Sequence, residues 1–357
     1  MNKLEERKQL DAFRQLRLPD GKTDFCSNDY LGIVKNRLIE EKLAGRSFNA
    51  GSTGSRLLSG NYALIEETEK QIARFHEAPA GLLFNSGYDA NTGLLGCVPQ
   101  RGDTIIYDQL SHASIRDGIR LSLAMSFSFL HNDLEDLHKK LQHASGNIFV
   151  VTESVFSMDG DKAPLLKIAE LCDTHKAHLI VDEAHATGVV GERGEGFVQV
   201  LGLQNSCLAR VQTFGKACGV HGAIVLGSDL LRNYLVNFAR SFIFTTSLPE
   251  AGVAAIKASY DIFPLLVEER RRLNTLIRQF QGASSRFKLL QSETPIQVVI
   301  IPGNSEVKKE AFSLQSKQLD IRPILYPTVA KGAERLRIVL HAFNSEEELS
   351  QIINCLR

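Results

Sequence analysis

The stretch VQTFGKACGVHGAIVLG, residues 211–227, places a lysine, Lys216, among small residues and between two short, strand-like apolar runs. A lysine amine in a partly dry pocket loses its charge readily and then acts as a nucleophile that can form a Schiff base. Gly215, Ala217 and Gly219 leave space around this amine. A surface lysine in a turn is the ordinary structural explanation, but the small neighbours and the following apolar strand favour a reactive one.

A second stretch, HLIVDEAH at 178–185, ends an apolar run with Asp182 and brings His185 three residues later. Open α/β sheets gather ligand-binding groups at the carboxyl ends of their strands. A helix cap or a core ion pair is the structural alternative for Asp182. A lysine together with an acid is what pyridoxal 5'-phosphate (PLP) requires, because the lysine bonds the aldehyde and the acid keeps the pyridine nitrogen protonated. We therefore expect PLP as the cofactor.

Strand-like and helix-like segments alternate from about residue 62 to 356. Several strand candidates are continuous apolar runs, such as 148–151, which is typical of strands buried on both faces. The alternation predicts an α/β fold with a mainly parallel central sheet. We expect strands at 104–107, 148–152, 178–182, 210–213, 222–227, 297–301 and 335–340, and helices at 3–18, at 164–175 and within 249–283.

These elements suggest three parts of the chain. Residues 1–30 are expected to form an N-terminal helix and arm, with the helix stopped near Pro19 and Gly21. Residues 31–262 are expected to form the large PLP-binding domain. Residues 263–357 are expected to form a smaller α+β C-terminal domain, reached through the helical stretch 249–283.

The composition is that of an ordinary globular protein, with 357 residues, 43% hydrophobic and 23% charged. Lys plus Arg and Asp plus Glu both number 41, so no charge excess points to nucleic acid. The six cysteines are scattered without a C-x-x-C pair, which argues against a metal site or a disulfide framework and fits a reducing compartment. The charged N-terminus and the lack of a long apolar run predict a cytoplasmic enzyme without a membrane span.

Several ordered motifs carry a resemblance over nearly the whole chain. They are SNDYLG at 27–32, LSHAS at 110–114, TESVFSMDGD at 152–161, VDEAH at 181–185 and TFGKACG at 213–219. Together they resemble the α-oxoamine synthases, class II PLP enzymes of fold type I. The resemblance implies a decarboxylative condensation of an amino acid with an acyl thioester.

The resemblance also implies roles around the cofactor ring. Lys216 would bond the cofactor, Asp182 would pair with the pyridine nitrogen, and His185 would bond the phenolic oxygen. His112 would stack on the pyridine face and touch the substrate. Without the resemblance, His112 reads as a residue at a helix N-terminus with Ser111 as the cap.

A probable helix opens at Ser86-Gly87-Tyr88, after the apolar residues 82–84. Glycine at a helix start lets backbone N–H groups approach a phosphate, which the positive end of the helix favours. By resemblance, the further cofactor contacts are Ser86, Gly87, Tyr88, Ser157, Thr213 and Thr246, with Ser154 near the cofactor. Thr246 lies in a segment through which a partner subunit reaches the phosphate, so the resemblance implies a homodimer with composite active sites.

A guanidinium is the expected partner of the carboxylate of an amino-acid substrate, because its forked N–H groups match the two carboxylate oxygens. Arg337 is our candidate. Arg335 shares its strand face, and a polar outer face is the structural alternative for both. By resemblance, Asn28, His112, Thr328 and Arg14 also contact substrate, with Arg14 at the acyl end. The expected substrates are L-alanine and a pimeloyl-type thioester of coenzyme A or acyl carrier protein.

Three alternatives remain. Other α-oxoamine synthases join glycine to an acetyl group or serine to a palmitoyl group. A class II aminotransferase would share the lysine and the acid, but such enzymes mostly stack an aromatic ring where His112 stands. An inactive partner subunit normally lacks the lysine or the acid, and both are present.

The glycine-rich segment 51–60 lacks the G-K-[ST] of a Walker motif and is interpreted as a loop that shapes the active-site wall.

Overall fold

The computed structural model of the chain describes residues 2–16, 18–19 and 21–357. The chain forms two compact units. The large unit comprises Ile33–Phe156 and Lys162–Val267. The small unit comprises Met1–Gly32, Ser157–Asp161 and Glu268–Arg357.

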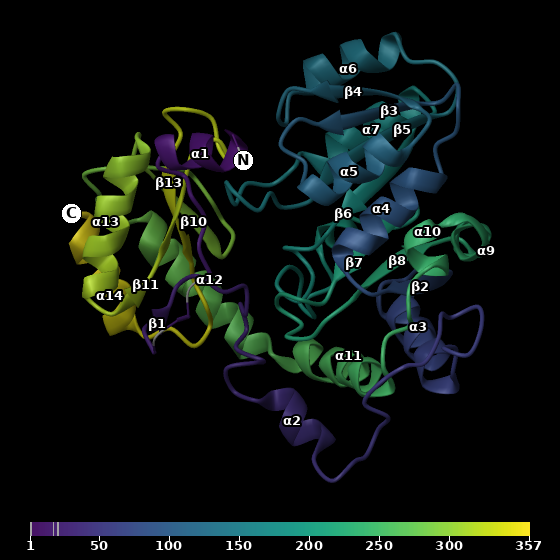
Figure 1. Ribbon diagram of the computed structural model, residues 1–357, viewed down its shortest axis with the longest axis horizontal. Helices are drawn as coiled ribbons and strands as arrows, with labels where there is room; N and C mark the ends of the chain where they lie inside the picture. Colours follow the sequence, from purple (N-terminus) through teal and green to yellow (C-terminus); the bar gives the residue numbers. More distant parts are fainter. Residues whose placement is uncertain (1, 17, 20) are drawn as a thin grey trace. The chain divides into compact units, whose positions relative to one another are not determined.

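The large unit is built on one mixed sheet (Figure 1). Its strand order is β2-β8-β7-β6-β5-β3-β4, and β8 alone among these described strands runs antiparallel to its neighbours. This confirms the predicted α/β fold of a type I PLP enzyme with a mainly parallel sheet. The strands are β2 (Ala80–Phe84), β3 (Thr104–Asp108), β4 (Met125–Phe129), β5 (Ile148–Glu153), β6 (His178–Asp182), β7 (Cys207–Thr213) and β8 (Ala223–Gly227).

Helices cover both faces of this sheet, as the continuous apolar runs require. Alternate residues of β5 show the division, because Phe149 and Val151 belong to one core and Val150 to the other. The first core includes side chains of α4, α5, α9 and α10, and the second includes those of α6, α7 and α8. The helices are α2 (Leu38–Leu43), α3 (Ala63–Phe75), α4 (Gly87–Cys97), α5 (Ala113–Leu121), α6 (Leu134–Gln142), α7 (Leu165–Thr174), α8 (Phe197–Val200), α9 (Asp229–Phe238), α10 (Arg240–Ile243) and α11 (Glu250–Ile262).

The small unit contains an antiparallel sheet of order β12-β13-β10-β9 and a parallel pair, β1 with β11. The strands are β1 (Thr23–Asp24), β9 (Lys288–Leu289), β10 (Ile296–Ile300), β11 (Leu319–Asp320), β12 (Arg322–Ile324) and β13 (Arg335–Val339). Its helices are α1 (Asn2–Gln9), α13 (Asn304–Ser316) and α14 (Glu346–Leu356), with most of α12 (Val267–Gln281), which follows the short 3-10 turn η1 (Phe263–Leu265).

The prediction of a helix over 3–18 is wrong, because α1 ends at Gln9. The chain then turns through Asp11, which has a positive φ of 50°. The amides of Asp11 and Ala12 bond back to the carbonyls of Lys8 and Arg7. Since α1 buries no side chain, no packed apolar face supports a longer helix. Residue 17 of the predicted helix lies outside the described residues.

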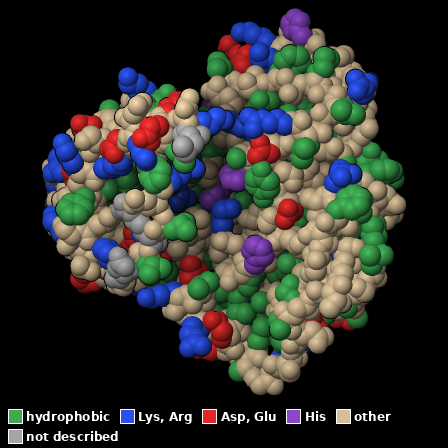
Figure 2. All heavy atoms as spheres, in the orientation of Figure 1, with side chains coloured by type: hydrophobic (Ala, Val, Ile, Leu, Met, Phe, Trp, Pro, Cys, Tyr) green, Lys and Arg blue, Asp and Glu red, His purple; other side chains and the backbone are tan. Residues whose placement is uncertain are grey.

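The surface drawn in Figure 2 intersperses basic and acidic side chains, in keeping with the balanced charge of the sequence. In the part of the chain that the structure describes, no helix has both the length and the apolar character needed to cross a membrane.

Candidate active site

Parallel strands end at one edge of a sheet, and in the large unit several of them end in a polar residue there. β5 ends at Glu153, β6 at Asp182 and β7 at Thr213. In the register of β5 and β6, Glu153 lies directly opposite Asp182. The edge therefore brings together residues that the sequence separates by 60 positions, at the place where such sheets bind ligands.

The Asp182 carboxylate is buried and accepts hydrogen bonds from two N–H donors. Its Oδ1 accepts from the amide of Ala184 at 2.9 Å, and its Oδ2 accepts from Asn91 Nδ2 at 2.7 Å. An ionised carboxylate oxygen has two lone pairs, so each oxygen can take a further donor. This is the acceptor that a protonated pyridine nitrogen requires.

Lys216 follows β7 and is half-buried. Its Nζ donates to Thr213 Oγ1 at 3.4 Å. The start of α4 meets the same threonine, since a Cβ built on Gly87 would come within 2.5 Å of Thr213 Cγ2. The helix begins at Gly87, and Ser86 is its N-cap, with the hydroxyl accepting from the Asp89 amide. A helix N-terminus, a threonine hydroxyl and a lysine therefore converge, as a phosphate site requires.

His112 is itself the N-cap of α5, so the expectation of Ser111 as the cap is wrong. The ring Nδ1 accepts from the amide of Ser114 at 3.2 Å, because the imidazole reaches back over the first turn. Burial lowers the pKa of His112, and the charge of Lys216 lowers it further, whereas Asp182 acts in the opposite direction. The net shift favours a neutral imidazole.

Glu153 is a residue that the sequence analysis did not single out. Its Oε1 accepts from the His112 amide at 2.6 Å, so it fixes the start of α5. Burial, followed by the neighbouring charge of Asp182, raises the pKa of Glu153 to about 8. The available signal was an acid at the end of a buried strand, the same pattern that identified Asp182.

The remaining predicted residues of the large unit lie as follows. His185 is buried just after β6. Tyr88 is 47% exposed and its hydroxyl bonds Asp117. The Thr246 carbonyl accepts from Asn85 Nδ2 at 2.9 Å, next to the N-cap of α4. Ser154 Oγ is buried, and within the described residues it has no hydrogen-bond partner.

These features fit PLP. The lysine amine, the buried carboxylate and the threonine beside a helix N-terminus supply an aldehyde partner, a ring-nitrogen partner and a phosphate site. The unpartnered Ser154 hydroxyl leaves one polar group available to a ligand.

The small unit brings together three other predicted residues. Arg337 Nε donates to the Ser157 carbonyl at 2.8 Å, and Arg337 Nη2 donates to Asn28 Oδ1 at 3.0 Å. Arg335, by contrast, forms an ion pair with Asp159. These two acceptors of Arg337, a carbonyl and an amide oxygen, are neutral, so its charge suits an anionic ligand better than that of Arg335. The alternative of a polar outer face is wrong for Arg335, which is buried.

Arg14 and Thr328 form a separate pair in the small unit. Arg14 Nη2 donates to Thr328 Oγ1 at 3.2 Å. Both line a surface pocket of about 740 Å³ whose wall also includes Phe13, Phe312 and Tyr326. The pocket therefore combines apolar side chains with four cationic ones, those of Arg7, Arg14, Arg322 and Lys308.

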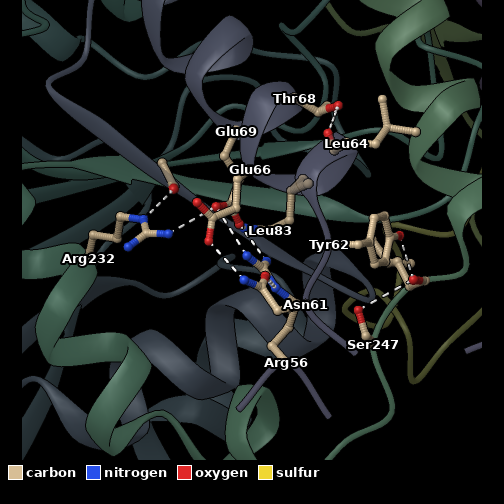
Figure 3. Close-up of polar contacts among 12 residues, drawn as sticks. Arg56, Asn61, Tyr62, Leu64, Glu66, Thr68, Glu69, Leu83, Arg232 and Ser247 are labelled. Atoms are coloured by element: carbon tan, nitrogen blue, oxygen red, sulfur yellow. Dashed lines mark hydrogen bonds and ion pairs between the residues drawn. The ribbon is translucent and has the colours of Figure 1, made fainter. Parts of the chain in front are cut away.

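Arg56 anchors the loop 51–60 of the large unit through polar contacts (Figure 3). Arg56 reaches Glu69 of α3, which also accepts from Arg232 of α9 and from the Leu83 amide of β2. The Gly54 carbonyl of this loop accepts from the amide of Ser247 at 2.9 Å. The loop thus supports the segment that carries Thr246.

The chain matches the family model described as aminotransferase class I and II over residues 20–356. The 8-amino-7-oxononanoate synthase of Emericella nidulans is 41% identical, over 95% of this chain and 89% of the relative. A serine palmitoyltransferase from S. paucimobilis, solved with PLP and myriocin bound, superposes with a TM-score of 0.89 and 27% identity, over 99% of this chain and 96% of that chain.

The 8-amino-7-oxononanoate synthase of Francisella tularensis is also similar in structure, with a TM-score of 0.79 and 28% identity, over 94% of this chain and 97% of that chain. The named relatives and the site geometry agree with the motifs in the sequence. The chain belongs to the class I and II aminotransferase family of PLP-dependent enzymes, within its α-oxoamine synthase group.

Proposed function

We propose that this enzyme condenses L-alanine with a pimeloyl-type acyl thioester, releasing carbon dioxide and the free thiol and giving an α-amino ketone. The observation that carries the proposal is the convergence of Lys216, Asp182 and His112 at one sheet edge. A second support is that the chain is 41% identical to an enzyme named 8-amino-7-oxononanoate synthase.

Bound PLP supplies an electrophilic aldehyde and a ring that delocalises the electron pair left when a proton departs from the substrate Cα. Lys216 Nζ is the group that would hold the aldehyde and, once released, take the Cα proton. Asp182 would hold the ring nitrogen in its charged form. Thr213, with the start of α4 at Gly87, would hold the phosphate.

His112 and Arg337 would act on the substrates. The neutral imidazole of His112 can donate one hydrogen bond to a substrate oxygen while adding no positive charge to the site. Arg337 has a guanidinium fork that matches the two oxygens of an amino-acid carboxylate. The remaining cofactor contacts that we propose are Ser86, Tyr88, Ser157, His185 and Thr246, and the remaining substrate contacts are Asn28, Thr328 and Arg14.

We also propose a homodimer, because the segment 244–247 resembles one that reaches the phosphate of a partner subunit. The carrier of the acyl group would be coenzyme A or an acyl carrier protein. A cytoplasmic location is part of the same proposal.

The test is a competition experiment with purified enzyme. L-alanine, glycine and L-serine are each offered with pimeloyl, acetyl and palmitoyl thioesters, while thiol release and the amino ketone are measured. We expect the highest kcat/KM for alanine with the pimeloyl donor. One methyl group separates alanine from glycine by only about 1–3 kcal/mol, so slow turnover of glycine is compatible with this proposal. Preference for serine with palmitoyl, or for glycine with acetyl, would overturn it.

A further inference from the structure

A chain of hydrogen bonds links His112 to Asp182 through two side chains that the proposed function does not use. Asn91 Nδ2 donates to Asp182 Oδ2 at 2.7 Å and to Ser114 Oγ at 3.0 Å. Ser114 Oγ lies 2.7 Å from His112 Nδ1. Asn91 and Ser114 are 2% and 1% exposed, so water does not substitute for these partners.

The direction of each bond follows from what each group can donate. An ionised carboxylate only accepts, so Asp182 requires the amide nitrogen of Asn91 to face it. The same nitrogen has a second proton, which goes to Ser114 Oγ. The Ser114 hydroxyl has one proton and lies within hydrogen-bond distance of His112 Nδ1, which already accepts from the Ser114 amide. All of these donors are satisfied when His112 Nδ1 is unprotonated and the ring proton is on Nε2.

We propose that Asn91 and Ser114 are positioning residues: Asp182 orients Asn91, Asn91 orients Ser114, and Ser114 holds the imidazole of His112 neutral, with the proton on Nε2. The assembly is built from α4, α5 and β6, and it stands on the geometry of three buried groups, Asn91, Ser114 and Asp182, that reach the more exposed ring of His112. Its catalytic meaning rests on the proposed function. There, a neutral ring can lie against a cationic pyridine ring without repulsion, and its Nε2–H can donate to a substrate oxygen.

Other charged groups also act on His112. Asp117 of α5 and Asp182 favour its charged form, and Lys216 disfavours it. Glu153 of β5 bonds the His112 amide and not the ring. The hydrogen bonds from Ser114 act in the same direction as burial, because donors aimed at Nδ1 stabilise the neutral ring.

The first experiment measures the tautomer and the pKa of His112 by NMR in the apo protein with ¹⁵N-labelled histidine. Signals are assigned by comparison with His112→Gln. We expect a protonated Nε2 and an unprotonated Nδ1 in the wild type. Ser114→Ala should raise the pKa of His112 by about 0.5–1 unit, the size of one net hydrogen bond, and should introduce Nδ1-protonated ring.

Two further variants test whether Asp182 orients the His112 ring through Asn91 and Ser114. In Asn91→Asp the new carboxylate accepts the Ser114 proton, so Nδ1 loses its donor and the pKa of His112 should rise further. Asp182→Asn removes the charge that orients Asn91, so the tautomers should mix although Asn91 and Ser114 are intact. Asn237→Asp, which adds the same charge on the exposed side of α9, should leave the tautomer and pKa of His112 unchanged.

In the holoenzyme, Ser114→Ala should move the acidic limb of the kcat/KM profile to higher pH. A wild-type His112 ring protonated on Nδ1 would overturn the proposed roles of Asn91 and Ser114. An unchanged tautomer and pKa of His112 in Ser114→Ala would do the same. Either result would leave the proposed reaction intact, because no substrate is present in the NMR experiment. Conversely, failure to form the amino ketone would overturn the proposed function without affecting the tautomer.

Discussion

Arg56 Nη1 lies 2.7 Å from Glu69 Oε1, and both side chains are buried. Glu69 also accepts from Arg232 and from the Leu83 amide, so one carboxylate joins the loop 51–60 to α3, α9 and β2. Removing one partner of a buried ion pair leaves the other charge without compensation. The position of the loop 51–60 therefore depends on Glu69.

We expect Glu69→Ala to lower the free energy of unfolding by about 3–5 kcal/mol, measured by denaturant titration. Glu268→Ala is the matched control, because it removes an exposed ion pair with Arg271 and should cost no more than about 1 kcal/mol. Equal effects of the two substitutions would show that the buried network does not hold the loop.

Gly87→Ala should weaken PLP binding, because the added Cβ would lie 2.5 Å from Thr213 Cγ2. The measurement is an equilibrium titration of apo enzyme with PLP. Thr213→Ser removes the clashing methyl group and keeps the hydroxyl, so the double variant should recover affinity relative to Gly87→Ala. A double variant that binds no better than Gly87→Ala would assign the loss to another cause.

Lys216→Ala should abolish turnover while the protein stays folded, because it removes the amine that we propose bonds the aldehyde and moves the Cα proton. Borohydride reduction of the wild-type holoenzyme, followed by peptide mass spectrometry, should place the cofactor on the peptide containing Lys216. An exposed lysine of α6, Lys139, provides the control, and Lys139→Ala should retain activity. Label on a different lysine would contradict the assignment.

Glu153 should make stability depend on pH. Its pKa is raised to about 8 in the folded protein, so the folded state binds more protons than the unfolded state between the usual Glu range and pH 8. The contribution of Glu153 to stability is thus fully present below that window and is lost as pH rises through it. We expect a slope of at most about 1.4 kcal/mol per pH unit.

Glu153→Gln stays uncharged and should remove this slope. The measurement is the unfolding free energy of both proteins between pH 5 and 9. Parallel pH curves for wild type and Glu153→Gln would mean that the carboxyl titrates normally in the fold.

Arg337→Gln should raise the KM for the amino acid about 10–100-fold, because it removes the charge-assisted hydrogen bonds that we propose to the substrate carboxylate. Arg335→Gln is the informative comparison. It breaks the buried ion pair with Asp159, so it should lower stability and leave the amino-acid KM nearly unchanged. A larger KM effect at Arg335 than at Arg337 would reverse the assignment of the two arginines.

The sequence by itself determined the fold class and the family. Continuous apolar runs such as 148–152 read as strands buried on both faces, and β5 is such a strand. Prediction from local sequence patterns failed for segments that are short or exposed. The edge strand β4 alternates apolar with polar residues but is exposed over Met125–Ser128, and it was not predicted. The helix prediction over 3–18 failed because periodicity does not reveal whether an apolar face finds a packing partner.

Only the tertiary structure decided which polar side chains meet. Asn91 lies in α4, Ser114 in α5 and Asp182 at the end of β6, so no sequence spacing links them. Their contact depends on the packing of both helices against the same face of the sheet. In the same way, the register of β5 and β6 sets Glu153 against Asp182 and raises its pKa, since burial and charge proximity are properties of the folded chain.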